Sequence, residues 1–136
     1  MKKFLLILVA ITFYSQADLK ASLDEELETL MPKVIEWRHD IHQYPELGNR
    51  EFRTSNKVKV HLESLGIKVE SGIAYTGVVG LIEGGKPGPT IALRADMDAL
   101  PVEEKTGLPF ASKVRTQYLG NDVGAVSYTH LRAHET

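Results

Sequence analysis

Two aspartates at the end of an apolar segment are the residues of this chain best suited to chemistry. Residues 91–95 (IALRA) have the pattern of a β-strand, and Asp96 and Asp98 follow directly. In open α/β sheets, ligand sites gather at the carboxyl ends of the strands. A carboxylate there can orient a metal-ligating histidine, bind a divalent cation or act as an acid or base. The structural alternative is that both aspartates only cap turns.

Two other pairs of polar residues have the spacing of a functional pair. His39 and His42 are three positions apart and could share a metal on one helix face. Histidines near a helix C-terminus are also favourable without a metal, because they interact with the exposed carbonyl groups. Glu103 and Glu104 resemble a catalytic pair, but they follow a proline in a loop, so we expect them to be solvated or to cap a turn.

The C-terminal eleven residues, 126–136 (VSYTHLRAHET), contain a second histidine pair. On a helix, His130 and His134 would share a face and could hold a metal. However, this segment is what a transposon-tagmentation sequencing adaptor encodes when it is translated in one frame. We therefore predict that residues 126–136 are not native and that the histidine pair is an artefact. Recovery of this segment in frame from genomic DNA would contradict this prediction.

The composition excludes several classes of protein. Lys and Arg number 16 against 18 Asp and Glu, and a net charge of −2 gives no basic footprint for nucleic acid. The chain has no cysteine, which excludes a disulfide scaffold, a cysteine-ligated zinc site and a cysteine nucleophile within it. Hydrophobic residues make up 43% and charged residues 25%, values typical of a globular protein.

The N-terminus has the pattern of a secretory signal peptide. A short positive start precedes an apolar run over residues 4–14, and Ser15 and Ala17 place small residues before a cleavage site at Asp18. The run is shorter than the roughly 20 apolar residues that span a bilayer, so we expect no membrane anchor. The sequence therefore predicts a signal peptide over residues 1–17 and a secreted or periplasmic protein.

The remaining chain begins with two predicted helices. A capping box starting at Ser22 predicts the start of the first helix, whose apolar stripe runs towards His42 and which Pro32 should kink or split. A second helix is predicted over residues 51–65, with Gly66 as its stop. Its inward-facing residues are expected to be Phe52, Ser55, Val58, Leu62 and Leu65.

After the helices, the hydrophobic period changes to that of strands. Residues 67–70, 78–83 and 90–95 are predicted strands. The turn-rich segment 84–89 (GGKPGP) predicts an antiparallel hairpin between the second and third of them. Two helices followed by a strand hairpin and a carboxylate-rich strand-end loop predict the beginning of an α/β domain.

Two motifs resemble a known family of enzymes. Residues 93–104 (LRADMDALPVEE), followed by 106–112 (TGLPFAS), form one, and residues 38–48 (RHDIHQYPELG), followed by 51–55 (EFRTS), form the other. In order and spacing, both are similar to the metal-dependent N-acyl-amino-acid amidohydrolases. These are the hippurate hydrolase and auxin-conjugate hydrolase branch of the aminoacylase-type metallopeptidases. The similarity extends from about Leu30 to Gly124.

The resemblance implies an enzyme larger than this chain. Residues 18–125 would be the N-terminal part of a metallopeptidase-like catalytic α/β domain that holds two Mn or Zn ions, and the smaller lid domain, a possible homodimer contact, is absent. The implied reaction is hydrolysis of the amide bond of small-molecule N-acyl amino acids. A dipeptide exopeptidase of the same family is one alternative. A non-catalytic secreted binding module is the alternative from another class.

The resemblance also implies roles for the two aspartates. Asp98 matches the aspartate that steadies a metal-binding histidine in the wider family, and Asp96 occupies the position of that histidine, as it does in this branch. Both are therefore candidate catalytic residues that support the metal ligands, with Asp98 the stronger. The branch takes its first ligands from a Cys-Gly-His motif after a glycine-rich stretch like residues 120–124. That motif, the later Glu-Glu pair and the other histidine ligands are not found here, so no metal ligand is expected within this chain.

Overall fold

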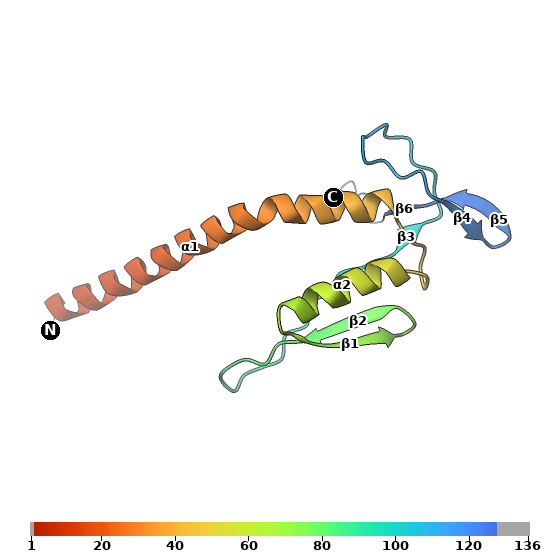
Figure 1. The fold of residues 1–136 in the computed structure, drawn as a ribbon. Coiled ribbons are helices and arrows are strands. Elements are labelled where there is room, and N and C mark those ends of the chain that lie inside the picture. Colours follow the sequence, from red (N-terminus) through yellow and green to blue (C-terminus); the bar gives the residue numbers. More distant parts are fainter. Residues whose placement is uncertain (1, 128–136) are drawn as a thin grey trace. The chain divides into compact units, whose positions relative to one another are not determined.

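The computed structural model describes residues 2–127, with side chains from residue 19 onward, and the chain divides into two units, Met1–Arg38 and His39–Thr136. Helix α1, Lys2–Gln43, accounts for the described part of the first unit and ends within the second (Figure 1). The helix begins before Ser22, so the predicted start is wrong, and it continues through Pro32 without being split. A proline removes a single backbone hydrogen bond, and the turns on either side retain theirs.

The apolar stripe predicted for α1 has helical spacing but is exposed. Its exposed members are Leu23, Leu27, Leu30, Met31, Val34 and Ile35, whereas Ile41, near the end of the helix, is half-buried. Among the described residues, no helix has the combination of length and hydrophobicity that crossing a membrane requires. The stripe is therefore an apolar surface in this structure.

Helix α2, Phe52–Ser64, confirms the second predicted helix. Gly66 has φ = 74°, and its amide donates to the Glu63 carbonyl at 2.9 Å. The next amide, of Ile67, donates to the Leu62 carbonyl at 3.1 Å. This is the left-handed C-terminal cap that glycine favours, and it confirms Gly66 as the stop.

The inward face of α2 is narrower than the sequence predicts. Ser55 is buried and Val58 and Leu62 are half-buried, as expected. Phe52 and Leu65, at the two ends of the helix, are 67% and 61% exposed. The helix packs on the hairpin of the next two strands, and Phe52 and Leu65 lie at the ends of the helix, outside this contact face.

Strands β1, Lys68–Ile73, and β2, Gly77–Leu81, form an antiparallel hairpin against which α2 packs (Figure 1). They confirm the first two predicted strands. The hairpin, however, joins these two strands and not the second and third. Its turn contains Ala74 and Tyr75, both with positive φ, a conformation typical of tight hairpin turns.

The third predicted strand, residues 90–95, is not formed. The chain between β2 and residue 99 pairs with no strand among the described residues, and Ile91 and Leu93 are 82% and 96% exposed. A strand needs a neighbour for its backbone hydrogen bonds, and none of the described strands lies against it. The strand-like pattern therefore remains an extended apolar segment.

Four short strands complete the described residues. Strand β3, Ala99–Leu100, pairs antiparallel with β6, Val126–Ser127, and β4, Arg115–Tyr118, pairs antiparallel with β5, Asn121–Gly124. The buried apolar residues are Leu47, Ala99, Ala125 and Val126. With its helices and small sheets, the chain has the predicted α/β class, and its small core surrounds β3.

The segment predicted to be an adaptor translation lies largely outside this description. Its first two residues, Val126 and Ser127, are buried in β6. His130 and His134 lie outside the described residues. The non-native origin of residues 126–136 therefore stays a prediction.

Replacing Gly77 with alanine is expected to destabilise the hairpin. A β-carbon at this position would lie 2.5 Å from the Ile73 carbonyl oxygen, which is backbone and cannot turn aside. Overpacking of this kind costs about 1–3 kcal/mol. Thermal unfolding of the full-length protein measures the change, with Gly85→Ala as the control because a β-carbon there meets no atom within 4 Å. Equal stability of the two variants would contradict the prediction.

Candidate functional site

Asp98 lies at the entry to β3, beside the turn that follows α1. It is half-buried, and a β-carbon built on Gly48 would lie 3.9 Å from its Oδ2 atom. The neighbouring Ala99 amide donates to the Glu46 carbonyl at 2.8 Å, and Leu47 forms a parallel bridge with Ala99. The start of β3, next to Asp98, is therefore attached to the turn around residues 46–48. Because the strand predicted at residues 90–95 is not formed, Asp98 precedes a strand and does not follow one as the sequence predicts.

Asp96 has a different environment. Its Oδ1 accepts from Arg94, whose Nε lies 3.0 Å away and whose terminal nitrogen lies 2.8 Å away. The Arg94 side chain is almost fully exposed, and ion pairs of this kind contribute little to stability. Of the two predicted site residues, Asp98 is thus the one held close to buried structure.

The described residues do not by themselves form a metal centre. Within residues 19–127, whose side chains are described, no three His, Asp or Glu side chains gather in a way that could hold an ion. His39 stacks on Phe110, with ring centroids 3.8 Å apart, and His42 meets the same ring edge-on at 5.7 Å. These described side chains therefore do not by themselves fit a two-metal site.

A buried pair, Glu104 and His42, joins the end of α1 to the loop after β3. Their side chains are 2% and 1% exposed, and His42 Nε2 lies 3.0 Å from Glu104 Oε1. The Glu104 carboxylate also accepts from the Thr106 hydroxyl and the Ser112 amide, each at 2.5 Å. Burial by itself raises the pKa of Glu104, but these hydrogen bonds outweigh it and hold the pKa below its ordinary value. Glu104 is therefore ionised at neutral pH.

The two glutamates have the roles that the sequence predicts, one each. Glu103 is exposed, as expected of a solvated residue, and Glu104 caps the turn by accepting from the Ser112 amide, with a side chain that is only 2% exposed. The sequence places His42 and Glu104 62 positions apart, and no local pattern links them. Only the resemblance, which includes both segments in its motifs, points to these positions.

Two further glutamates organise the turn beside Asp98. Glu46 accepts from the amides of Arg53 and Thr54 at 2.9 and 2.8 Å, and so caps the first turn of α2. Glu51, which is buried, accepts from the Asn49 amide at 3.0 Å and from the Thr76 hydroxyl at 2.5 Å. Sequence reasoning missed both roles. A glutamate ahead of a helix start is a signal that could have revealed the Glu46 cap.

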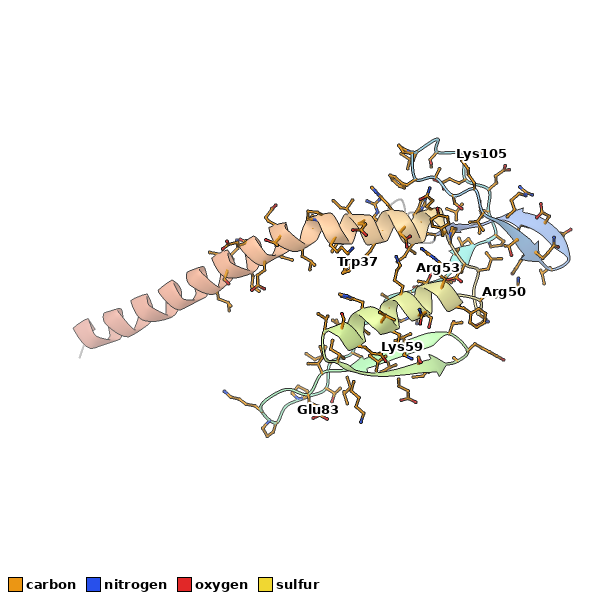
Figure 2. The ribbon with its side chains drawn as sticks, in the orientation of Figure 1. Trp37, Arg50, Arg53, Lys59, Glu83 and Lys105 are labelled. Carbon is orange, nitrogen blue, oxygen red and sulfur yellow. The ribbon has the colours of Figure 1, made fainter. Side chains whose placement is uncertain are left out.

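A cluster of charges joins the end of α1 to α2. The Asp40 carboxylate accepts from Arg53 at 2.5 and 2.6 Å and from Lys57 at 2.5 Å. Burial by itself raises the pKa of Asp40, but the hydrogen bonds and positive charges of Arg53 and Lys57 hold it below its ordinary value. The Arg53 guanidinium also lies 5.1 Å from the Tyr44 ring centroid. Figure 2 shows Arg53 on the first turn of α2.

The loop carrying Glu104 passes very close to β5. A β-carbon on Gly124 would lie 2.8 Å from both the Glu103 Cα and the Val102 carbonyl oxygen. At this separation only a glycine fits, so Gly124 allows the loop to approach the sheet. Arg50 ties the same sheet to the turn after α1 by donating to the Gln117 carbonyl at 2.7 Å. Loop, sheet and turn are thus held together around β3.

Comparison with known proteins places the chain in a class of enzymes. No profile of a known protein family matches it. It is 50% identical over 99 residues to thermostable carboxypeptidase 1 of Saccharolobus solfataricus, covering 72% of this chain and 25% of that protein. It is 52% identical over 87 residues to N-acetyl-L-cysteine deacetylase of Bacillus subtilis, covering 64% and 21%. Both relatives are named as hydrolases of peptide or acyl-amide bonds.

The solved structures narrow the class to a family. The chain superposes on the Bacillus subtilis YXEP protein, described as a dinuclear metal-binding peptidase of the M20 family, with a TM-score of 0.62 and 39% identity. The match covers 73% of this chain and 26% of that one. The chain is therefore similar in sequence and structure to M20 amidohydrolases and metallopeptidases, and it spans about a quarter of the length of the relatives it matches. This confirms the resemblance seen in the two motifs.

Proposed function

We propose that the full-length protein carrying this chain is a metal-dependent hydrolase that cleaves the amide bond of N-acyl amino acids. The observation that supports this most is Asp98, held at the strand end beside Gly48 within a segment half identical to a deacetylase of N-acetylcysteine. Two divalent ions, Mn or Zn, would serve the reaction. Their ligands would come from residues other than those described, and Asp98 would steady one of those ligands.

A dipeptide exopeptidase is the second candidate. It is favoured by the carboxypeptidase of Saccharolobus solfataricus, which is 50% identical over the matched segment. The two reactions break the same kind of bond and differ in what precedes it, an acyl group or an amino acid with a free amine. A non-catalytic binding module is the remaining alternative, and homodimer formation through a lid domain belongs to the proposed enzyme.

One assay of the full-length protein separates these functions. The protein is loaded with Mn or Zn and offered matched pairs of substrates, an N-acetyl amino acid and the dipeptide with the same C-terminal residue. Faster release of the amino acid from the acetyl compound supports the amidohydrolase, and the reverse supports the exopeptidase. Binding without release from either substrate would leave the binding module as the better description.

Export is also proposed, with cleavage after Ala17. The positive start, the short apolar run and the small residues before Asp18 support it. N-terminal sequencing of the protein recovered from the periplasm or the medium should begin at Asp18. Replacing Ala17 with a bulky residue such as phenylalanine should block processing, because the signal peptidase needs a small residue there. A full-length cytoplasmic product in the unmodified protein would contradict the proposal.

A further inference from the structure

The buried contact between His42 and Glu104 joins the two segments on either side of the strand end that carries Asp98. His42 lies in the last turn of α1, shortly before the Glu46 carbonyl that accepts from the Ala99 amide. Glu104 lies shortly after β3, in the loop that continues the same strand. The contact therefore links the end of α1 to the loop after β3, and Asp98 lies on the chain between these two attachment points.

The strand end has few other attachments within the described residues. Strand β3 contains only two residues, and so does its partner β6. On the other side, Ala99 forms a bridge with Leu47, and its amide donates to the Glu46 carbonyl at 2.8 Å. A ladder this short opens easily, because each residue that frays removes a large part of its pairing. Within these residues, the contact between His42 and Glu104 adds a further attachment on the far side of β3.

Glu104 is arranged to do this. Its carboxylate accepts from three donors on two segments: His42 on α1, and Thr106 and the Ser112 amide on the loop. Phe110, from the same loop, covers the contact by stacking on His39 and meeting His42 edge-on. Removing the carboxylate would release the loop and the helix end from each other at once.

We propose that His42 and Glu104 are positioning residues that hold Asp98 in place for catalysis, an inference that rests on the proposed function. The pair does not touch the reacting atoms. It acts through the backbone of β3, which it anchors at the exit while the turn around residues 46–48 anchors it at the entry. Small displacements of a catalytic group are costly, since a shift of about 1 Å can lower a rate by about a hundredfold.

The test uses the full-length protein and two readouts. Glu104→Ala is compared with Glu103→Ala, a neighbouring variant whose side chain is exposed and makes none of these contacts. Hydrogen exchange should accelerate in the peptide covering residues 96–102 of Glu104→Ala, while the β1–β2 hairpin exchanges as in the unmodified protein. Turnover should fall about tenfold or more with little change in KM. Glu103→Ala should change neither readout.

A second set of variants keeps the test decisive if Glu104→Ala does not fold. Glu104→Gln preserves the shape and an acceptor oxygen, and it should show the same local exchange in weaker form. His42→Ala supplies the other single variant. The double variant, His42→Ala with Glu104→Gln, should lose no more turnover than the worse of the two single variants, as expected of two residues that act as a unit. Additive losses would overturn the pairing.

The remaining outcomes separate this inference from the proposed function. If the unmodified protein releases no amino acid from any substrate, the proposed function fails, and hydrogen exchange still decides whether the pair holds β3. Exchange that rises equally in the β1–β2 hairpin would show a general loss of stability and overturn the inference. Unchanged exchange at residues 96–102 would overturn it as well.

Discussion

Replacing Asp98 with alanine in the full-length protein is expected to lower turnover about 10–100-fold, the usual effect of removing a carboxylate that steadies a metal ligand. The geometry favours this role because Asp98 is half-buried directly before β3 and its carboxylate lies beside Gly48. Asp96→Ala is expected to have a milder effect, since its carboxylate pairs with an exposed arginine. The measurement is kcat and KM on an N-acetyl amino acid, together with the metal content of each variant.

The two aspartate variants serve as controls for each other. They have the same chemistry and lie two positions apart, so a general loss of stability would affect both. Asp98→Asn tests whether charge or shape matters, because the amide keeps the shape but removes the charge that favours a neighbouring ligand. Turnover in Asp98→Ala equal to that of the unmodified protein would remove Asp98 from the mechanism. A larger loss in Asp96→Ala would reverse the two assignments.

Local rules predicted the parts of the fold that depend on near neighbours. The second helix and its glycine stop follow from periodicity and from the left-handed cap at Gly66, both of which involve contacts within a few residues. The first two strands follow from their β-branched alternation in the same way. The predicted strand at residues 90–95 was wrong because a strand depends on a neighbour, which the local pattern does not supply.

The candidate site shows the same division. Asp96 and Asp98 were found because two carboxylates after a strand-like run are visible in a few residues of sequence. The buried pair of His42 and Glu104 was not found, because its members are 62 positions apart and each has a simpler local explanation. Glu46 and Glu51 were missed for a related reason. Their partners are mostly backbone amides, and a sequence does not show which amides a folded turn will leave without a helical partner.

Residues 18–125, produced alone, are expected to associate and to melt without a cooperative transition. The apolar segment at residues 90–95 is extended and exposed, with Leu93 96% exposed and no described strand pairing with it. An unpaired segment of this kind offers its backbone groups and apolar side chains to another copy. The buried apolar core is also small: within residues 18–125 its described members are Leu47, Ala99 and Ala125. Residues 18–125 alone should also not hydrolyse N-acyl amino acids with added Mn or Zn, because no group of described residues among them can hold an ion.

Light scattering and calorimetry measure this, and the chain offers a matched control. Ile91→Lys combined with Leu93→Lys should reduce association, because charges on an edge strand oppose pairing with another copy. Leu119→Lys replaces a leucine that is 83% exposed in the turn between β4 and β5, outside the apolar segment, and should leave association unchanged. If the Leu119→Lys variant reduced association as much as the double variant, the added positive charge would explain the effect, and the apolar segment at residues 90–95 would not. A soluble monomer that melts cooperatively would show that these residues form a closed domain, and would favour the binding module over the enzyme.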